Sequence, residues 1–458
     1  MNSTATVTDS TIDQEFVAGI VTKALRAGAS DAEAIFAEGD EFETLVRLGQ
    51  VEQLKEAGSR AIGLRVFQGL RTASTSSSDL TGEGIKRLIA GAMSLVRVTS
   101  EDPFVGLPER GEFGALSGDL DLYYEDVYSL PVAERIEYAR RTEAAAMAAD
   151  ERIQNSGGGS FDAASGRKIL ANSRGFVGES HRTSCSIAAQ PIAQLPEGGM
   201  QRDYWYSSQR SLLLLESPEA VGQEAARRTV RRLGARKIAT QRVPLVFSPE
   251  VARSILGAIG GAINGNAVYR GSSFLAGKLG ETVGGANLTI IDDGTMPGGF
   301  GSASFDGEGL PTRRKVVLDH GVLTSYLLNT YTARKLGLQS TGNASRGLAG
   351  APGIGAGNFY LEPGTKTPEE ILAGIPKGLY VTELIGHGVN LVTGDYSHGA
   401  SGLWIENGEL TYPVEEITVA GNLKEMLKNI SQIGNDLIFR SSVACPTISI
   451  EGMTIAGE

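Results

Sequence analysis

Histidine and cysteine are scarce in this sequence of 458 residues, which contains four histidines and two cysteines. Two cysteines, Cys185 and Cys445, are too few for a disulfide framework, and this usage favours a reducing cytoplasm as the location. No apolar run approaches the ~20 residues that span a membrane, so no membrane partner is expected. The first residues, MNSTATVTDSTIDQEF, carry neither a basic segment nor an apolar one, and no secretory signal is predicted.

Complete catalytic motifs are also missing. No two of the four histidines stand at helical ligand spacing, and none has a glutamate beside it, which excludes a helix-borne zinc site within this chain. There is no Gly-x-Ser-x-Gly elbow. The Gly-rich run 347–358 lacks the Gly-Lys-Ser/Thr ending of a phosphate loop. The motifs alone therefore supply no complete catalytic set.

One weak metal-binding alternative stays open near the C-terminus. Two imidazoles and two carboxylates could bind a metal there, although both histidines stand beside glycine in turn-like sequence. These candidate ligands are His387, Asp395, His398 and Glu406.

Two pairs of neighbouring carboxylates are a second possibility. Paired carboxylates can do acid–base work, but beside glycine such side chains usually cap turns. The pairs are Asp292 with Asp293 and Asp306 with Glu308; the second pair could anchor a loop or lie at an interface.

Acidic residues outnumber basic ones, 53 to 42, and the formal net charge is −11. This balance argues against a nucleic-acid partner. A local exception is the basic run at 227–237, where arginines spaced four apart form one solvated helix face; an anion-binding or docking face is the alternative.

The hydrophobic patterns predict an α+β chain with antiparallel sheets. An N-terminal α+β domain is expected over 1–100, with helices at 13–28 and 82–98. Between these helices, turns at Gly39-Asp40 and at 56–59 should separate three strands. Residues 101–130, rich in Pro, Gly and Asp, are expected to form a linker.

The rest of the chain should form two further domains. A middle α+β domain is expected over 131–240, where helices at 132–150 and 218–233 flank strands. A mainly-β domain is expected over 241–458. Its expected helices and hairpin turns are at 249–263, 368–373 and 422–433, and at Asp319-His320-Gly321 and Asn407-Gly408.

Several C-terminal segments resemble the TldD/PmbA family, also called the modulator-of-DNA-gyrase family. They are FDGEGLPT at 305–312, STGNASR at 340–346, VTGDYSHGASGLWIENGELTYPVEEITVAGNL at 392–423 and IGNDL at 433–437. The family's domain order also fits the N-terminal and middle parts of the chain. The resemblance implies a cytoplasmic metallopeptidase that degrades or trims short, unfolded peptides.

The resemblance implies two types of subunit that act together. The TldD-type half carries His-Glu-x-x-x-His on a helix and a later cysteine, which hold zinc; the zinc would activate water and the Glu would serve as base. The segment RGSSFLAGKLGETV at 270–283 fixes the register, and the three motif positions fall on Leu256, Gly257 and Gly261. The resemblance therefore implies the PmbA/TldE half, with no catalytic residue or metal of its own and with zinc in a TldD-type partner.

Within the family-like segments, Asn343, Arg346, Asp395 and Ser397 are candidates for lining a peptide chamber shared with the partner. Capping turns and joining loops is the alternative role for these four side chains. A homodimer, a standalone metallopeptidase that uses His387, Asp395 and His398, and a non-catalytic peptide-binding or regulatory protein also remain open.

Overall fold

The computed structural model describes residues 12–196 and 198–457, so that most of the N-terminal stretch that was searched for a signal lies outside the described residues. Its largest sheet, of seven strands, takes strands from both the first and the middle predicted domains. The strand order is β3-β2-β1-β4-β5-β6, with β7 beside β5. The strands are β1 Asp31–Arg47, β2 Gln50–Gln68, β3 Arg71–Ser77, β4 Ile153–Asn172, β5 Val177–Gln194, β6 Met200–Arg202 and β7 Trp205–Gln209.

The antiparallel pairing of β1 with β4 joins the two predicted domains in this one sheet. The predicted turns at Gly39-Asp40 and at 56–59 are wrong, because both segments continue as strand within β1 and β2. Gly39 is needed for a close approach instead: a Cβ at this position would lie 2.6 Å from the carbonyl oxygen of Ser165 on β4. The turn lies at Leu48 and Gly49, whose φ angles are 50° and 74°.

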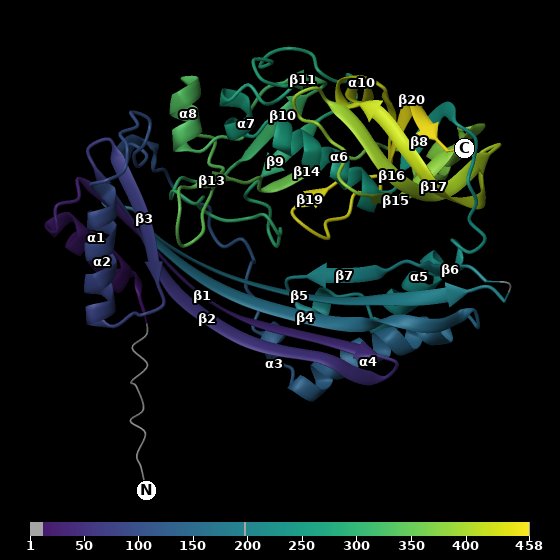
Figure 1. Cartoon of the computed structure of the whole chain (residues 1–458), viewed down its shortest axis with the longest axis horizontal. Helices are drawn as coiled ribbons and strands as arrows, with labels where there is room; N and C mark the ends of the chain where they lie inside the picture. The colour runs from purple at the N-terminus through teal and green to yellow at the C-terminus, as the bar shows by residue number, and fades with distance from the viewer. Residues whose placement is uncertain (1–11, 197, 458) are drawn as a thin grey trace, which may run out of the picture.

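The two faces of the sheet are covered differently, because successive side chains of a strand point to opposite faces. Buried apolar residues at even positions of β1, such as Phe36 and Phe42, pack against helices. Ile35, at an odd position, packs with Phe305 of the C-terminal domain. Figure 1 shows the sheet curving beneath that domain, with its concave side toward it.

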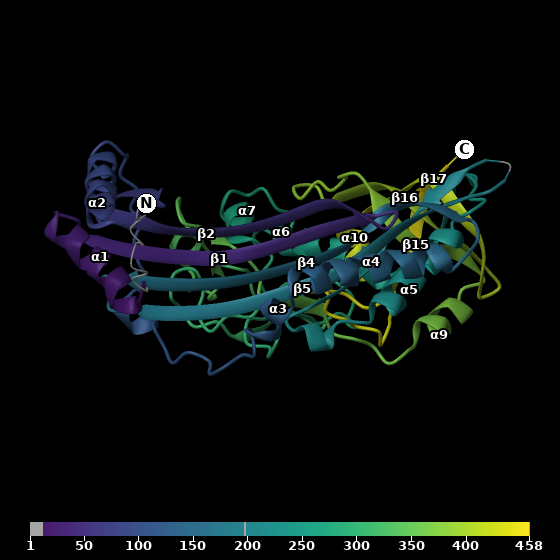
Figure 2. The ribbon, with the colours of Figure 1, turned by 90° about the horizontal axis from the view of Figure 1, so that it is seen from below.

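Helices α1 and α2 pack against one end of the sheet, and α4 and α5 against the other (Figure 2). The N-caps follow the sequence: the side chains of Asp13, Thr81 and Ser217 accept backbone hydrogen bonds at the starts of α1, α2 and α5. The α-helices are α1 Gln14–Arg26, α2 Gly82–Val96, α3 Asp126–Ser129, α4 Val132–Ala148, α5 Pro218–Val230, α6 Pro249–Ala262, α7 Gly265–Tyr269, α8 Thr330–Leu336, α9 Pro368–Ala373 and α10 Leu423–Lys428.

The segment predicted as a linker, 101–130, packs against the C-terminal domain. Asp102 accepts a hydrogen bond from the hydroxyl of Tyr331, and the guanidinium of Arg334 donates to the carbonyl oxygen of Leu107. Leu107 is fully buried. The segment thus connects the sheet to α8 while it links two helices in the chain.

The C-terminal domain holds the largest apolar core of the described residues. Strands β17-β16-β15-β8-β20-β18 form one sheet, and an additional pairing of β17 with β20 closes five of these strands into a ring. A second sheet runs β11-β10-β9-β14-β19. The strands are β8 Gln241–Phe247, β9 Ile290–Asp293, β10 Arg314–Asp319, β11 Val322–Leu323, β12 Ala344–Ser345, β13 Gly353–Ile354, β14 Asn358–Leu361, β15 Lys377–Ile385, β16 Asp395–Glu406, β17 Glu409–Asn422, β18 Ile430–Ile433, β19 Val443–Ala444 and β20 Ile448–Ala456.

The predicted α+β fold class with antiparallel sheets is confirmed. Both predicted hairpin turns form, and the φ angles of Asn407 and Gly408 are 51° and 83°, as a type I′ turn requires. The predicted helix at 422–433 is too long: α10 ends at Lys428 and β18 follows at once. Among the described residues, no helix is long and apolar enough to cross a bilayer.

Gly63 on β2 offers a test of how the C-terminal domain rests on the sheet. A Cβ at Gly63 would lie 1.7 Å from the carbonyl oxygen of Leu348, so G63A must push this loop off the sheet. We expect G63A to lower the free energy of unfolding by about 2 kcal/mol in urea titrations. G58A, on the same strand, is the control, because a Cβ there meets only a side-chain oxygen of Asp40 at 3.0 Å. Equal effects of both substitutions would contradict this docking.

Candidate functional site

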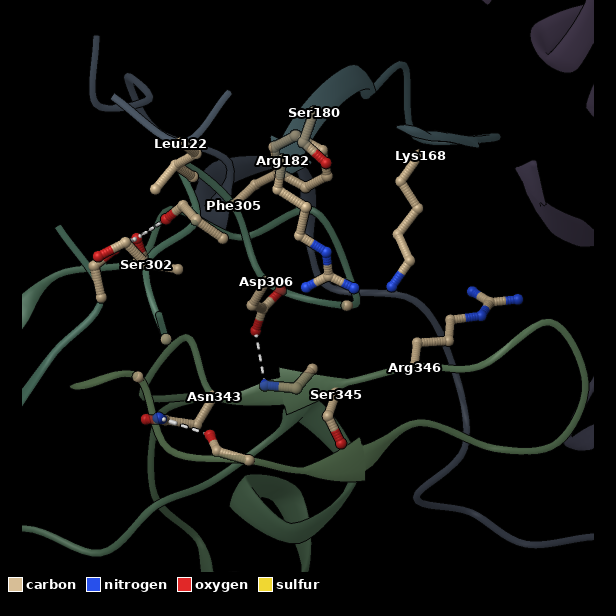
Figure 3. A pocket seen from close by; sticks show the side chains of 18 of the residues that line it. Leu122, Lys168, Ser180, Arg182, Ser302, Phe305, Asp306, Asn343, Ser345 and Arg346 are labelled. Atoms are coloured by element: carbon tan, nitrogen blue, oxygen red, sulfur yellow. Dashed lines mark hydrogen bonds between the residues drawn. The ribbon is translucent and has the colours of Figure 1, made fainter. Parts of the chain in front are cut away.

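A cavity of about 480 Å³ lies between the concave face of the long sheet and the C-terminal domain. The sheet contributes residues of β1, β4 and β5. The C-terminal domain contributes three loop regions, at 300–307, 342–346 and 355–357. Polar side chains from both sides meet across this space (Figure 3).

Asp292 at β9 fixes two of these loops. Its Oδ1 accepts a hydrogen bond from the backbone N–H of Gly357 at 2.6 Å, and its Oδ2 accepts one from Nδ2 of Asn343 at 2.8 Å. Oδ2 also pairs with Nζ of Lys315 at 2.7 Å. Asn343 donates to the carbonyl oxygen of Gly355 and accepts from the hydroxyl of Thr341. Asn343 therefore lines the cavity, with its amide already used to join loops; a role in a peptide chamber shared with a partner stays a prediction.

Asp306 and Glu308 anchor the third loop region. The carboxylate of Asp306 accepts hydrogen bonds from the backbone N–H groups of Glu308, Leu310 and Ala344 at 2.9 to 3.0 Å. Glu308 accepts from the backbone N–H of Thr330 at 2.8 Å, at the start of α8. Of the two roles left open for this pair, loop anchoring is what the structure shows.

Burial and, next to it, the neighbouring charge of Glu308 raise the pKa of Asp306 to about 7, against the lowering effect of three backbone donors. Burial likewise raises the pKa of Glu308, which the guanidinium of Arg65 opposes. The floor of the cavity thus contains a carboxyl group that changes charge near neutral pH.

Arg346 ties the C-terminal domain to the sheet through a buried ion cluster. Its Nη1 lies 2.5 Å from Oε1 of Glu33 on β1, and Arg65 on β2 pairs with the same oxygen. The side chains of Glu33 and Arg346 are 0% and 1% exposed. Burial lowers the pKa of Arg346, and the charge of Glu33 opposes this. Arg346 also lines the cavity, and its Nη1 is paired with Glu33, so that contact with a peptide stays a prediction for this residue.

The other two candidates, Asp395 and Ser397, lie outside this cavity on β16 and are exposed. Asp395 accepts hydrogen bonds from Thr393 and Asn422, which lower its pKa, so it closes a turn. The structure therefore separates the four predicted residues into two pairs.

The alternative metal set is not brought together. Among the residues that the structure describes, no group of three His, Cys, Asp or Glu side chains lies close enough to hold a metal ion. His387 and Asp395 are exposed, whereas His398 is buried beside the ring of Tyr396, 4.6 Å away between centroids. The hypothesis that His387, Asp395 and His398 bind a metal is therefore wrong for this structure, with or without Glu406.

Sequence reasoning missed Lys168 on β4 and Arg182 on β5, which reach into the cavity from the sheet (Figure 3). No motif contains them. The available signal was strand alternation: Cys185 and Phe161 face the helices, so even positions of β4 and β5 face the C-terminal domain.

The sequence of this chain matches known proteins over most of its length. Models of the PmbA/TldA metallopeptidase family match in three parts: domain 1 at 32–96, the central domain at 125–233 and the C-terminal domain at 240–457. The chain is 40% identical over 435 residues to a protein named metalloprotease PmbA from Escherichia coli O157:H7, which covers 95% of this chain and 94% of that protein. The chain belongs to the PmbA/TldD metallopeptidase family.

Solved structures of similar proteins have the same fold. A protein named as a modulator of DNA gyrase from Bacteroides thetaiotaomicron has a TM-score of 0.91 at 28% identity, covering 99% of this chain and all of that one. TldE from Thermococcus kodakarensis has the same fold, with a TM-score of 0.86 at 22% identity over 96% of this chain and 99% of that one.

The residues of α6 do not fit the metal that the family name implies. Leu256 is buried in the apolar core, and Gly257 and Gly261 have no side chain that could donate to a cation. Gly261 instead faces Leu391, which would lie 3.2 Å from an added Cβ. Cys445 is fully buried, and burial raises the pKa of its thiol, which disfavours the thiolate that zinc binds.

Replacing Arg346 should show how much the ion cluster stabilises the chain. R346M leaves two buried carboxylates, those of Glu33 and Glu308, with only Arg65, so we expect a loss of about 3 kcal/mol in the free energy of unfolding. R314M is the control, because the exposed pair of Arg314 and Glu362, 3.4 Å apart, should contribute less than about 1 kcal/mol. Similar losses in both variants, measured by urea unfolding, would contradict a stabilising cluster.

The raised pKa of Asp306 predicts how the stability of the chain depends on pH. A carboxyl whose pKa rises from 3.8 unfolded to about 7 folded favours folding at low pH, and this contribution is lost as pH rises between the two values. D306N removes this titration but keeps the size of the side chain. The stability of D306N relative to the unmodified chain should therefore rise from pH 4 to 7, by up to about 1.4 kcal/mol per pH unit, and stay constant above.

Urea unfolding of both proteins at several pH values measures this difference. The hydrogen bond that D306N loses at Ala344 shifts all values by a constant amount. A difference that does not change with pH would show that Asp306 titrates at its usual pKa.

Proposed function

We propose that this chain is the metal-free PmbA/TldE-type subunit of a cytoplasmic TldD/PmbA metallopeptidase that degrades or trims unfolded peptides. In this proposal the zinc belongs to a TldD-type partner subunit. The present chain contributes the partner surface and part of the chamber that encloses the peptide.

The observation that carries the proposal is the chemistry of α6. The resemblance to the family puts the three motif positions on α6, at Leu256, Gly257 and Gly261, and none of these side chains can bind a metal. Zinc needs three or four protein ligands, and among the described residues no other group of three candidate ligands replaces them. In this proposal, the zinc of the peptidase therefore comes from another chain.

The long sheet supports the peptide part of the proposal. Residues 50–59 of β2 pair on one side with β1, and no strand within the described part of the chain pairs with their other side. An extended peptide can add to such an edge through backbone hydrogen bonds, with little demand on its sequence. A folded protein offers no free strand, so this recognition would favour unfolded peptides.

Reconstitution with a TldD-type subunit tests the proposal. We expect the purified chain alone to contain no stoichiometric zinc and to leave an unfolded peptide intact. After it is mixed with the partner, a complex should elute in gel filtration, and mass spectrometry should detect cleaved peptide. The control is a mixture in which the partner lacks its motif glutamate, because this mixture should assemble without cleavage.

Two outcomes would contradict the proposal. Stoichiometric zinc with peptidase activity in this chain alone would make it a standalone metallopeptidase. An intact peptide held by the active mixture would make it a binding or regulatory protein.

A further inference from the structure

Two cationic side chains, Lys168 and Arg182, line the cavity between the sheet and the C-terminal domain. Within the described part of the chain, neither Lys168 nor Arg182 has a hydrogen bond or an ion pair to its side-chain nitrogens. The other Lys and Arg side chains of the lining each have an ion pair: Arg167 with Glu38 and Glu179, Lys315 with Asp292, and Arg346 with Glu33.

The geometry of the sheet holds these two cations close together. β4 and β5 are antiparallel, with Lys168 opposite Ser180 and Arg182 opposite Gly166. Lys168 and Arg182 are therefore diagonal neighbours on the same face of the sheet, the spacing at which long side chains interact. Figure 3 shows both side chains reaching into the same space, with Arg182 beside Asp306 and the end of Lys168 between Arg182 and Arg346.

The nearby positive charges affect the pKa of Lys168. Burial lowers the pKa of Lys168, and the charges of Arg182 and Arg346 lower it further. An anion placed between Lys168 and Arg182 would remove the repulsion between them. Such an anion would also favour the charged form of Lys168.

The number of cations and the planar geometry of the guanidinium limit the chemical class of the ligand. Above pH 7, where Asp306 is ionised, its charge offsets one of the two cations Lys168 and Arg182, so that a singly charged ligand balances the cavity better than a doubly charged phosphate. A guanidinium binds a planar carboxylate through two parallel hydrogen bonds. Beside the cations, the lining is apolar at Ile35, Leu170 and Phe305, which suits a side chain next to the carboxylate.

We propose that this cavity binds the C-terminal carboxylate of a peptide, with Lys168 and Arg182 as its cationic partners. The peptide as ligand rests on the proposed function; the carboxylate rests on the cavity alone. Its volume of about 480 Å³ suits the end of a peptide chain, and lies in the range of small-ligand sites. Recognition of a chain end would select short peptides without reading their sequence.

Binding to the isolated full chain tests this inference, because it needs neither the partner subunit nor cleavage. The probe is a hexapeptide of alanine and glycine that carries fluorescein at its N-terminus, with either a free C-terminal carboxylate or a C-terminal amide. Fluorescence polarisation should show about tenfold tighter binding of the free carboxylate, as expected for loss of one charge-assisted contact.

Substitutions locate the site. K168Q and R182Q should each reduce affinity for the free carboxylate to about that for the amide, and leave the affinity for the amide unchanged. K424Q, a charge-matched change at an exposed position of α10 outside the cavity lining, should behave like the unmodified chain. Thermal unfolding of each variant confirms that it is folded; neither cavity cation has a partner to lose, so we expect no destabilisation.

Equal affinities for carboxylate and amide peptides, or a loss of affinity in K424Q equal to that in K168Q, would overturn the inference. Sodium acetate that displaces the peptide at equal concentration would also overturn it, by showing that a small carboxylate suffices. A peptide that binds by its carboxylate but survives the reconstituted complex would count against the proposed function alone. If the reconstituted complex cleaves the peptide but this chain binds the carboxylate and the amide peptides equally well, the result would count against this inference alone.

Discussion

The pairing of β1 with β4 determines which residues can meet in this molecule. It joins segments that are separated by the whole of α2, the 101–130 segment and α4 into one antiparallel sheet. Because side chains alternate along a strand, this register sends Phe36 toward the helices and Glu33 toward the C-terminal domain. A slip by one residue would exchange the two faces and place a carboxylate in the apolar core beneath α1. The cavity and the ion cluster both depend on this register.

The contact between sheet and C-terminal domain is specified by charge as well as by apolar packing. Buried ions are costly to remove from water, and pairing recovers that cost only when the geometry is good. Glu33 is paired with Arg346 from the C-terminal domain and with Arg65 from β2. Any docking that separates Arg346 from Glu33 would leave this buried carboxylate with one cation fewer. The cluster therefore fixes the shape of the cavity next to it, where Lys168 and Arg182 project from the neighbouring strands.

The sequence predicted local features well and long-range ones poorly. The ends of α1, α5 and α9 follow from caps, prolines and apolar spacing within a few residues. The single long sheet could not be predicted in this way, since β1 and β4 carry no local sign of their pairing and Gly39 is typical of a turn. In the site, family-like segments pointed to Asn343 and Arg346, which do line the cavity. They could not separate these from Asp395, because neighbours in a motif need not be neighbours in space.

The acidic character of the whole chain and the cationic character of the cavity act over different distances. A net charge of −11 creates a field that salt screens within roughly 8–10 Å of the surface. A ligand inside the cavity is surrounded by Lys168, Arg182 and the apolar residues beside them, where the effective dielectric constant is lower and near charges dominate. A local surplus of positive charge can therefore act on a ligand inside the cavity although the chain as a whole is acidic. Composition alone reports only the first of these two effects, and the second requires the fold.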